Sequence, residues 1–199
     1  VERGKLLPRP VDGVPPVRVH GQGGLLDVTT HPKFASNGLV YWSFANGSGS
    51  EVGTEVARGR LSGDAAGGYR LDQVEVIFRQ QPKASGTPHF GSRLVWDREG
   101  NLFVTLGDRG QMQEAQNLNG HIGKIVRVTE TGTVPANNPF RGQAGARPEI
   151  FSLGNRNVQG AALHPVTGEL WAHEHGPQGG DEVNIIRPGR NYGWPVITY

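Results

Sequence analysis

Apolar residues along this chain occur in short runs that alternate with turn-forming residues. The longest stretch without glycine or proline is residues 69–81, which is thirteen residues long. An average α-helix has about 11–12 residues and ends at such punctuation. The 31 glycines and 14 prolines among 199 residues therefore leave little room for helices. Short strands joined by turn-rich loops fit this pattern better, and the sequence predicts an all-β fold.

Three strand-turn-strand units follow one another along the chain. The first contains Asn37-Gly38, a strong hairpin signal, and an aromatic-rich strand follows it at residues 39–44. The same order of apolar strand, glycine turn and apolar strand returns at residues 94–106 and 162–173. The turn glycines of the three units are Gly38, Gly100 and Gly168. Their spacings of 62 and 68 residues indicate a repeat architecture.

About four strands per repeat fit the blade of a β-propeller, because weaker strands at residues 56–61, 74–79 and 124–128 lie between the units. A repeat of this length means that the blades carry long loops, and a sandwich of unrelated hairpins is the alternative. Propellers close with about 4–8 blades, and this sequence holds about three. We therefore expect residues 1–199 to be part of a single propeller domain whose N- and C-terminal blades are missing.

Charge and composition argue against several other classes of protein. The formal net charge is only +2, and the arginines are scattered rather than gathered in a stripe with aromatic residues, so nucleic-acid binding is not expected. No run of about 18 apolar residues is present, so no membrane span is expected. The absence of cysteine excludes disulfides and thiolate metal sites.

Two loops in equivalent positions carry candidate functional side chains. His89 lies in the loop at residues 86–91, before the second unit, where propeller loops reach the central channel. A histidine there could act as a general base, since its unperturbed pKa is about 6.5. Arg156 and Asn157 occupy the equivalent loop before the third unit, and arginine suits a planar anionic ligand. Asn157 and Gln159 are expected to line one surface. A structural histidine and a surface arginine are the alternatives.

The segment after the third unit contains candidate metal ligands. The Gly176-Pro177 turn offers backbone carbonyl oxygens near the carboxylates of Asp181-Glu182, and a hard cation such as calcium prefers oxygen ligands. These carboxylates could equally support the loop or face solvent. His173 and His175 share one face of an extended strand and could bind zinc instead, although no third ligand is evident nearby.

Six motifs occur in order along residues 21–195, which is nearly the whole chain. They are GQGGLLDVTTHPKF, HFGSRLVWDREGNLFVTLGD, NGHIGKIVRV, SLGNRNVQGAALHP, EHGPQGGDEVNII and GRNYGWP. Together they resemble the PQQ-dependent soluble aldose sugar dehydrogenases, which include soluble quinoprotein glucose dehydrogenase and sorbosone dehydrogenase-like proteins. The family fold is a six-bladed propeller, which agrees with the repeat and implies that roughly half of the native protein is absent here.

The resemblance also implies roles for individual residues. The matching positions are His89 as catalytic base, Gln22 beside the cofactor, Arg156 and Asn157 as the cofactor-binding pair, and Gly176 and Pro177 as calcium ligands through their carbonyls. The implied reaction oxidises the anomeric C1 hydroxyl of an aldose to the lactone by hydride transfer to PQQ, with His89 taking the hydroxyl proton. Calcium would polarise the quinone carbonyl, and Arg156 would stabilise the charge on its oxygen. An external electron acceptor and a periplasmic or secreted location are also implied.

Three departures from the family pattern bear on the substrate and on cofactor binding. Pro88 stands where glucose-oxidising relatives carry an aspartate, so the hydrogen bond that orients His89 must come from elsewhere or is absent. His175 replaces a glutamine of those relatives. The lysine and arginines that grip the PQQ carboxylates in the family would lie beyond Tyr199. We therefore expect broad aldose specificity, and weak PQQ binding by this polypeptide alone.

Two other functions are open alternatives. A related propeller in some animal cell-surface proteins binds protein partners without catalysis, although such a module has no need to retain His89, Arg156 and the Gly176-Pro177 turn. A metal-dependent lactonase on a six-bladed propeller would need carboxylate or imidazole ligands that converge on one metal. The loops of this sequence do not obviously present such a set.

Overall fold

Three antiparallel sheets make up almost all of the regular structure in the computed structural model, which describes residues 1–197. The first sheet contains β1 (Leu25–Thr30), β2 (Leu39–Ser48), β3 (Glu51–Asp64) and β4 (Gly68–Arg79). The second contains β5 (Leu94–Trp96), β6 (Asn101–Thr105), β7 (Lys124–Thr129) and β8 (Ile150–Leu153). The third contains β9 (Val158–Leu163), β10 (Leu170–Glu174) and β11 (Glu182–Ile186). The prediction of an all-β fold is confirmed.

Helical structure is minor throughout the described residues. It comprises the four-residue helix α1 (Phe34–Asn37) and the 3-10 helix η1 (Met112–Gln116). Within residues 1–197 no helix is long and apolar enough to cross a membrane. The density of glycine and proline predicted this shortage of helices.

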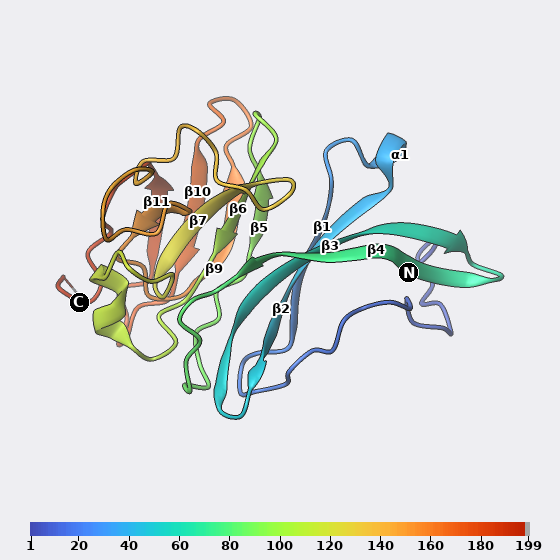
Figure 1. Ribbon diagram of the computed structural model, residues 1–199, viewed down its shortest axis with the longest axis horizontal. Helices are drawn as coiled ribbons and strands as arrows, with labels where there is room; N and C mark the ends of the chain where they lie inside the picture. Colours follow the sequence, from blue (N-terminus) through green and yellow to red (C-terminus); the bar gives the residue numbers. More distant parts are fainter. Residues whose placement is uncertain (198–199) are drawn as a thin grey trace.

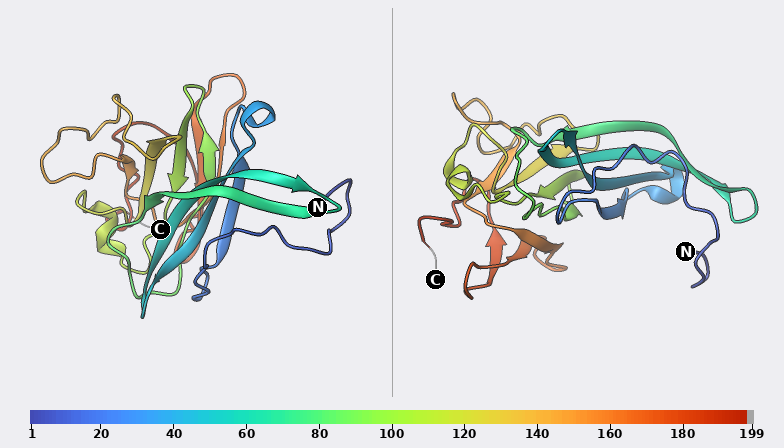
Figure 2. Two further views of the ribbon diagram at one scale, coloured as in Figure 1. Left: turned by 45° about the vertical axis from the view of Figure 1, so that its right-hand side comes forward. Right: turned by 90° about the horizontal axis from the view of Figure 1, so that it is seen from below.

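Each sheet is a meander in which neighbouring strands are also consecutive in sequence. Figure 1 shows the first sheet on the right and the other two on the left, and Figure 2 shows the same sheets from two further sides. The first strands of the three sheets, β1, β5 and β9, lie next to one another. The sheets are therefore arranged as three neighbouring blades of a β-propeller, as the repeat predicts.

The hydrophobic core lies between the sheets, and the second sheet is buried on both faces. Leu102 and Val104 of β6 pack against the first sheet, in a buried cluster that includes Phe78. Phe103, which lies between them in sequence, packs in a second cluster with Leu170 of the third sheet. Successive side chains of a strand point to opposite faces, so neighbouring residues of β6 enter different cores. Both sets of residues therefore have to be apolar.

The turn predicted at Asn37-Gly38 is not a two-residue hairpin. Helix α1 lies between β1 and β2, and Gly38 ends it with a φ of 64°. The Asn37 side chain accepts a hydrogen bond from Leu39 N (3.0 Å) and contacts His31 Nδ1 (2.8 Å). Asparagine and glycine still reverse the chain, but the buried His31 side chain and the helix lengthen the connection.

The hairpin β3–β4 extends well beyond the rest of the first sheet (Figure 1). Both strands are longer than the runs at residues 56–61 and 74–79 that the sequence predicts. The N-terminal lead-in runs beside the tip of this hairpin, where Asp12 N donates to Tyr69 O (3.0 Å) and Leu71 N donates to Asp12 O (2.8 Å). The lead-in therefore pairs with the otherwise open edge of β4.

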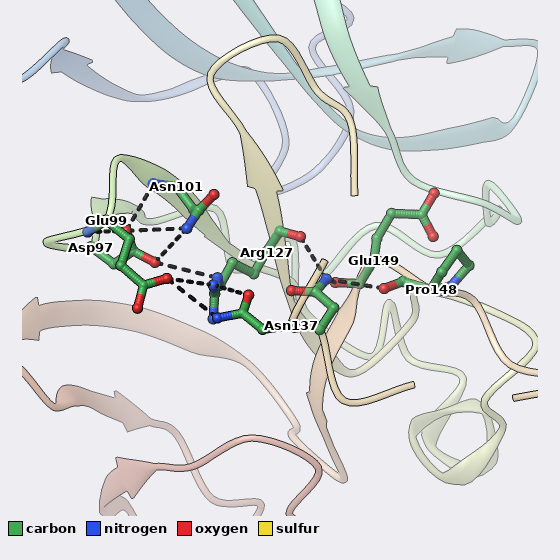
Figure 3. Close-up of polar contacts among 8 residues, drawn as sticks. Asp97, Glu99, Asn101, Arg127, Asn137, Pro148 and Glu149 are labelled. Carbon is green, nitrogen blue, oxygen red and sulfur yellow. Dashed lines mark hydrogen bonds and ion pairs between the residues drawn. The ribbon is translucent and has the colours of Figure 1, made fainter. Parts of the chain in front are cut away.

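A buried arginine fixes the β5–β6 turn to the second sheet (Figure 3). Nη2 of Arg127, on β7, donates to Glu99 Oε2 (3.2 Å) and Asn137 Oδ1 (2.6 Å), and its Nε lies 3.3 Å from Asp97 Oδ2. Asp97 Oδ1 in turn accepts the backbone N–H of Asn101 (2.8 Å). The two carboxylates thus offset the desolvation cost of burying the guanidinium.

Lys124 is a buried cation without such a carboxylate. It opens β7, is fully buried, and donates from Nζ to the backbone carbonyls of Glu114 and Ile122, each at 2.8 Å. Burial lowers the pKa of Lys124 from 10.5 to about 7. Between these values the unfolded chain binds a proton that the folded chain does not, so the free energy of unfolding should rise with pH in that window.

We expect the variant Lys124→Met to remove this pH dependence. Urea denaturation at several pH values from 7 to 10 should show wild type gaining stability relative to the variant by up to about 1.4 kcal/mol per pH unit. The variant Lys33→Met, which removes an exposed lysine, is the control. A difference between wild type and Lys124→Met that stays constant over this range would contradict the assignment.

Candidate functional site

The loops that enter β5 and β9 meet at one end of the sheets, beside the segment that follows β6. Gly91 N donates to Asn157 Oδ1 (3.2 Å), and Asp108 N donates to Arg156 O (2.7 Å). The structure thus joins the loop of His89 to the loop of Arg156, and their equivalent places in the repeat explain why they meet.

His89 is held in a sparsely populated backbone conformation. Its φ is 57°, in the left-handed region that a side chain other than glycine rarely adopts. The backbone N–H of His89 donates to Gln22 Oε1 (2.9 Å), which places Gln22 beside the histidine. Gly107 passes so close to His89 that a Cβ at position 107 would overlap its carbonyl oxygen. The glycine is therefore required for this approach.

Asp108 orients the imidazole ring of His89. Its carboxylate is 2 % exposed, and Oδ1 lies 2.7 Å from His89 Nδ1. Oδ1 also accepts Gly110 N (2.9 Å), and Oδ2 accepts Trp194 Nε1 (2.8 Å). Because an ionised carboxylate can only accept, Nδ1 carries the proton, and the neutral tautomer that this contact selects has its lone pair on Nε2. Asp108 thus supplies the orienting hydrogen bond that the Pro88 substitution left in question.

Sequence reasoning missed Asp108, although strand register could have found it. Leu94 of β5 pairs with Val104 of β6. The same register, continued beyond the ends of the two strands, places Asp108 opposite Phe90 and therefore beside His89. The aspartate in the LGD segment that follows β6 was the available signal.

Glu174, at the end of β10, fixes the turn that carries Arg156 and Asn157. Its side chain is buried, and Oε1 accepts Asn155 Nδ2 (2.8 Å). Oε2 accepts the backbone N–H of Arg156 and that of Asn157 (3.2 Å). Burial raises the pKa of Glu174, against the lowering effect of these hydrogen bonds. Sequence reasoning also missed this residue, because two of its three hydrogen-bond donors are backbone groups.

The Arg156 side chain bridges its own loop and the loop that holds the predicted metal ligands. Nη1 donates to the carbonyl oxygen of His175 (3.0 Å), and the guanidinium lies 5.3 Å from the centre of the Trp194 ring. Its buried Nε has no hydrogen-bond partner within the described residues. Asn157 is buried whereas Gln159 is exposed, so the prediction that they line one surface is wrong. Asn157 turns inward because its amide oxygen bonds the His89 loop.

The loop at Gly176-Pro177 is closed by Asp181. Gly176 N donates to Asp181 Oδ1 (2.9 Å), and this bond lowers the pKa of the Asp181 carboxyl. The carbonyl oxygens of Gly176 and Pro177 accept no hydrogen bond from any described residue. Two free carbonyls beside a carboxylate are the kind of ligand set that suits a hard cation.

The alternative zinc site at His173 and His175 is not formed. Their ring centres are 6.5 Å apart, and His173 lies over Gly160, where any Cβ would overlap its ring. His175 instead contacts Gln159 Oε1 (3.2 Å) and lies 3.6 Å from Asp181 Oδ2. Residues 1–197 contain no group of three or more His, Cys, Asp or Glu side chains that could hold a metal.

Arg156, Glu174, Gly176, Pro177 and Trp194 line one small pocket. A larger cavity of about 590 Å³ lies at the opposite end of the second and third sheets, beside the β5–β6 turn. Ion pairs such as Arg187–Glu169 (3.0 Å) occupy its rim, and it contains none of the predicted site residues. Of the predicted site residues, Arg156, Gly176 and Pro177 line the small pocket. His89 lies outside its lining and is linked to it through Asp108, which accepts a hydrogen bond from Trp194.

Two relatives at the sequence level match all or most of this chain. The aldose sugar dehydrogenase YliI of Escherichia coli K12 is 47% identical over 199 residues, which are 100% of this chain and 53% of that protein. Quinoprotein glucose dehydrogenase B of Acinetobacter calcoaceticus is 32% identical over 89% of this chain and 41% of its own length. The chain spans about half the length of the relatives that it matches.

Solved structures agree with the sequence relationship. The apo-form of the soluble aldose sugar dehydrogenase from E. coli superposes with a TM-score of 0.93, at 47% identity over 98% of this chain and 56% of that one. The PQQ-bound form of the aldose sugar dehydrogenase from Streptomyces coelicolor has a TM-score of 0.80, at 34% identity over 93% of this chain and 52% of that one.

A family model described as Glucose / Sorbosone dehydrogenase matches residues 1–199. The chain therefore belongs to the glucose/sorbosone dehydrogenase family.

Proposed function

We propose that this chain carries the catalytic part of a PQQ-dependent aldose sugar dehydrogenase, which oxidises the anomeric C1 hydroxyl to the lactone. The observation that carries the proposal is the His89–Asp108 pair, which lies in the loop cluster that also holds Arg156. The similarity to an aldose sugar dehydrogenase and to a PQQ-bound family member supports it.

The residues present fit the two groups that the family implies. Arg156 offers a buried, unpartnered Nε at the edge of the pocket, which suits the anionic oxygens of PQQ. The unused carbonyls of Gly176 and Pro177 suit calcium. When bound, PQQ supplies the hydride acceptor and calcium supplies a Lewis acid beside it.

The chain's own residues supply the acid–base chemistry. His89 Nε2 takes the proton of the C1 hydroxyl while the C1 hydrogen leaves with its electron pair and the C–O double bond forms. Asp108 stabilises the imidazolium that results, as the carboxylate of a catalytic triad does. Trp194 and Gly110 hold Asp108 in place, so the imidazole does not have to reorganise during the reaction.

We expect His89→Ala to bind PQQ but to lose the reaction. The full-length protein with calcium is titrated with PQQ, an aldose is added without an electron acceptor, and absorbance follows reduction of the bound quinone. Loss of a positioned base should slow that reduction by about 10²–10⁴-fold. His164→Ala, at the other end of the third sheet, is the matched control.

The same titration tests the proposed function as a whole. Wild type that binds PQQ but is not reduced by any aldose would contradict the assigned substrate class. Wild type that does not bind PQQ at all would favour the non-catalytic propeller. Undiminished reduction in His89→Ala would remove the histidine from its assigned role.

We expect Glu174→Gln to weaken PQQ binding. An amide at this position cannot accept hydrogen bonds with both ends, so at least one donor among Asn155 and the backbone N–H groups of Arg156 and Asn157 loses its partner. An unsatisfied buried donor costs about 1–3 kcal/mol, and the PQQ dissociation constant should rise roughly 10-fold or more. Glu169→Gln, which alters an exposed ion pair at the other end, is the control. Equal PQQ affinity in wild type and Glu174→Gln would contradict the assigned role.

A further inference from the structure

Two neighbouring residues, Asp108 and Arg109, hold His89 from different sides. Asp108 binds the imidazole ring (2.7 Å), whereas Arg109 binds the backbone of the loop that carries it. Nη1 of Arg109 donates to the carbonyl oxygen of Pro88, the residue immediately before His89. The φ of Arg109 is 53°, in the left-handed region, and this backbone turn lets the side chains of Asp108 and Arg109 reach His89 and its loop from different sides.

Every polar contact of the Arg109 guanidinium is to a main-chain carbonyl. Nη2 donates to the carbonyl oxygens of Gly86 and Val52, the latter at 3.3 Å and on β3 of the first sheet. The guanidinium carbon also lies 3.4 Å from the centre of the Phe90 ring, which is stacked beneath it. Arg109 therefore contacts residues on both sides of His89 and ties their loop to the first sheet.

Arg109 differs from an ordinary structural arginine because no carboxylate among the described residues forms an ion pair with it, although the charge of the adjacent Asp108 favours its protonated form. Its side chain is completely buried, and burial lowers its pKa to about 10, so it stays protonated near neutral pH. A buried charge without a counter-ion is costly unless its hydrogen bonds are satisfied. The carbonyls of Gly86, Pro88 and Val52 accept from Nη1 and Nη2, whereas the buried Nε has no hydrogen-bond partner within the described residues. The inward turn of the Gly86 and Pro88 carbonyls accompanies the left-handed conformation of His89.

We propose that Arg109 is a positioning residue for His89, and that it keeps the imidazole where Nδ1 meets Asp108 and Nε2 faces the substrate. The inference rests on the proposed role of His89 as the base. A planar fork that binds two carbonyls and stacks on a ring is a geometry that lysine does not reproduce.

Arg127 provides the matched control for loss of a buried arginine. It is 7 % exposed and lies near the Phe103 and Phe151 rings, but it pairs with Asp97 and Glu99 at the other end of the second sheet (Figure 3). Both Arg109→Met and Arg127→Met remove a buried guanidinium, and only the first removes contacts to the His89 loop.

The first test uses the full-length protein with calcium and PQQ. Arg109→Met should keep PQQ affinity and KM for the aldose near wild type while kcat falls roughly 10²-fold, the loss expected when a catalytic group is misplaced by about 1 Å. Arg109→Lys, which keeps the charge, should recover part of kcat, and Arg127→Met should lower the melting temperature with kcat unchanged.

Wild-type kcat in Arg109→Met overturns the inference. If Arg109→Met does not fold, wild-type kcat in Arg109→Lys overturns it. Parallel losses of kcat and PQQ affinity in both methionine variants overturn it as well.

The second test needs neither cofactor nor activity. In protein labelled with ¹⁵N-histidine, the Nδ1–H of His89 should give a downfield, exchange-protected proton signal because Asp108 accepts it, and His89→Ala assigns that signal. Arg109→Met should lose the signal and Arg127→Met should keep it, whereas a signal that persists in folded Arg109→Met refutes the inference. If the signal behaves as expected but wild type does not oxidise an aldose, the positioning role stands and the proposed function fails.

Discussion

Hydrogen bonds from buried charged side chains to main-chain groups hold the two central loops of the site in place. Glu174 accepts backbone N–H groups of the Arg156–Asn157 turn, and Arg109 donates to backbone carbonyls of the His89 loop. Each charge is removed from water, so each loop has to keep the conformation that satisfies it. The geometry of the candidate site thus depends on two side chains of opposite charge, each of which acts on the backbone of a loop.

The propeller frame brings these two loops together. The first strands of the sheets are neighbours, so the segments that enter β5 and β9 arrive at the same end. The cores between sheets fix the distance between the blades, since β6 contributes alternate residues to both of them. The opposite end of the sheets carries the Arg127 ion pairs and the larger cavity, and the site stays apart from both.

The repeat, the fold class and the position of the two loops could be predicted from the sequence because each depends on local patterns. The turns predicted at Gly100 and Gly168 are present in the structure, where they connect β5 to β6 and β9 to β10. The prediction of a hairpin turn at Asn37-Gly38 was wrong because the side chain of His31, which precedes the turn motif in sequence, takes part in the connection.

The residues that hold the site were much harder to predict. Glu174 and Arg109 bind main-chain atoms, and every residue type presents the same main-chain atoms, so no spacing of side chains reveals the contact. Asp108 is the exception, since the β5–β6 register places it beside His89. Trp194 lies in the segment after β11, far from Asp108 in sequence, so their hydrogen bond depends on the tertiary structure and no local pattern predicts it.

The central claim is that His89 acts through Nε2 because Asp108 fixes the proton on Nδ1. The most direct measurement is the single-turnover rate at which an aldose reduces bound PQQ in Asp108→Asn. An amide that donates to Nδ1 would force the opposite tautomer and leave Nε2 protonated, so the account predicts a loss of about 10²–10⁴-fold with PQQ affinity retained. A wild-type rate in this variant would contradict it.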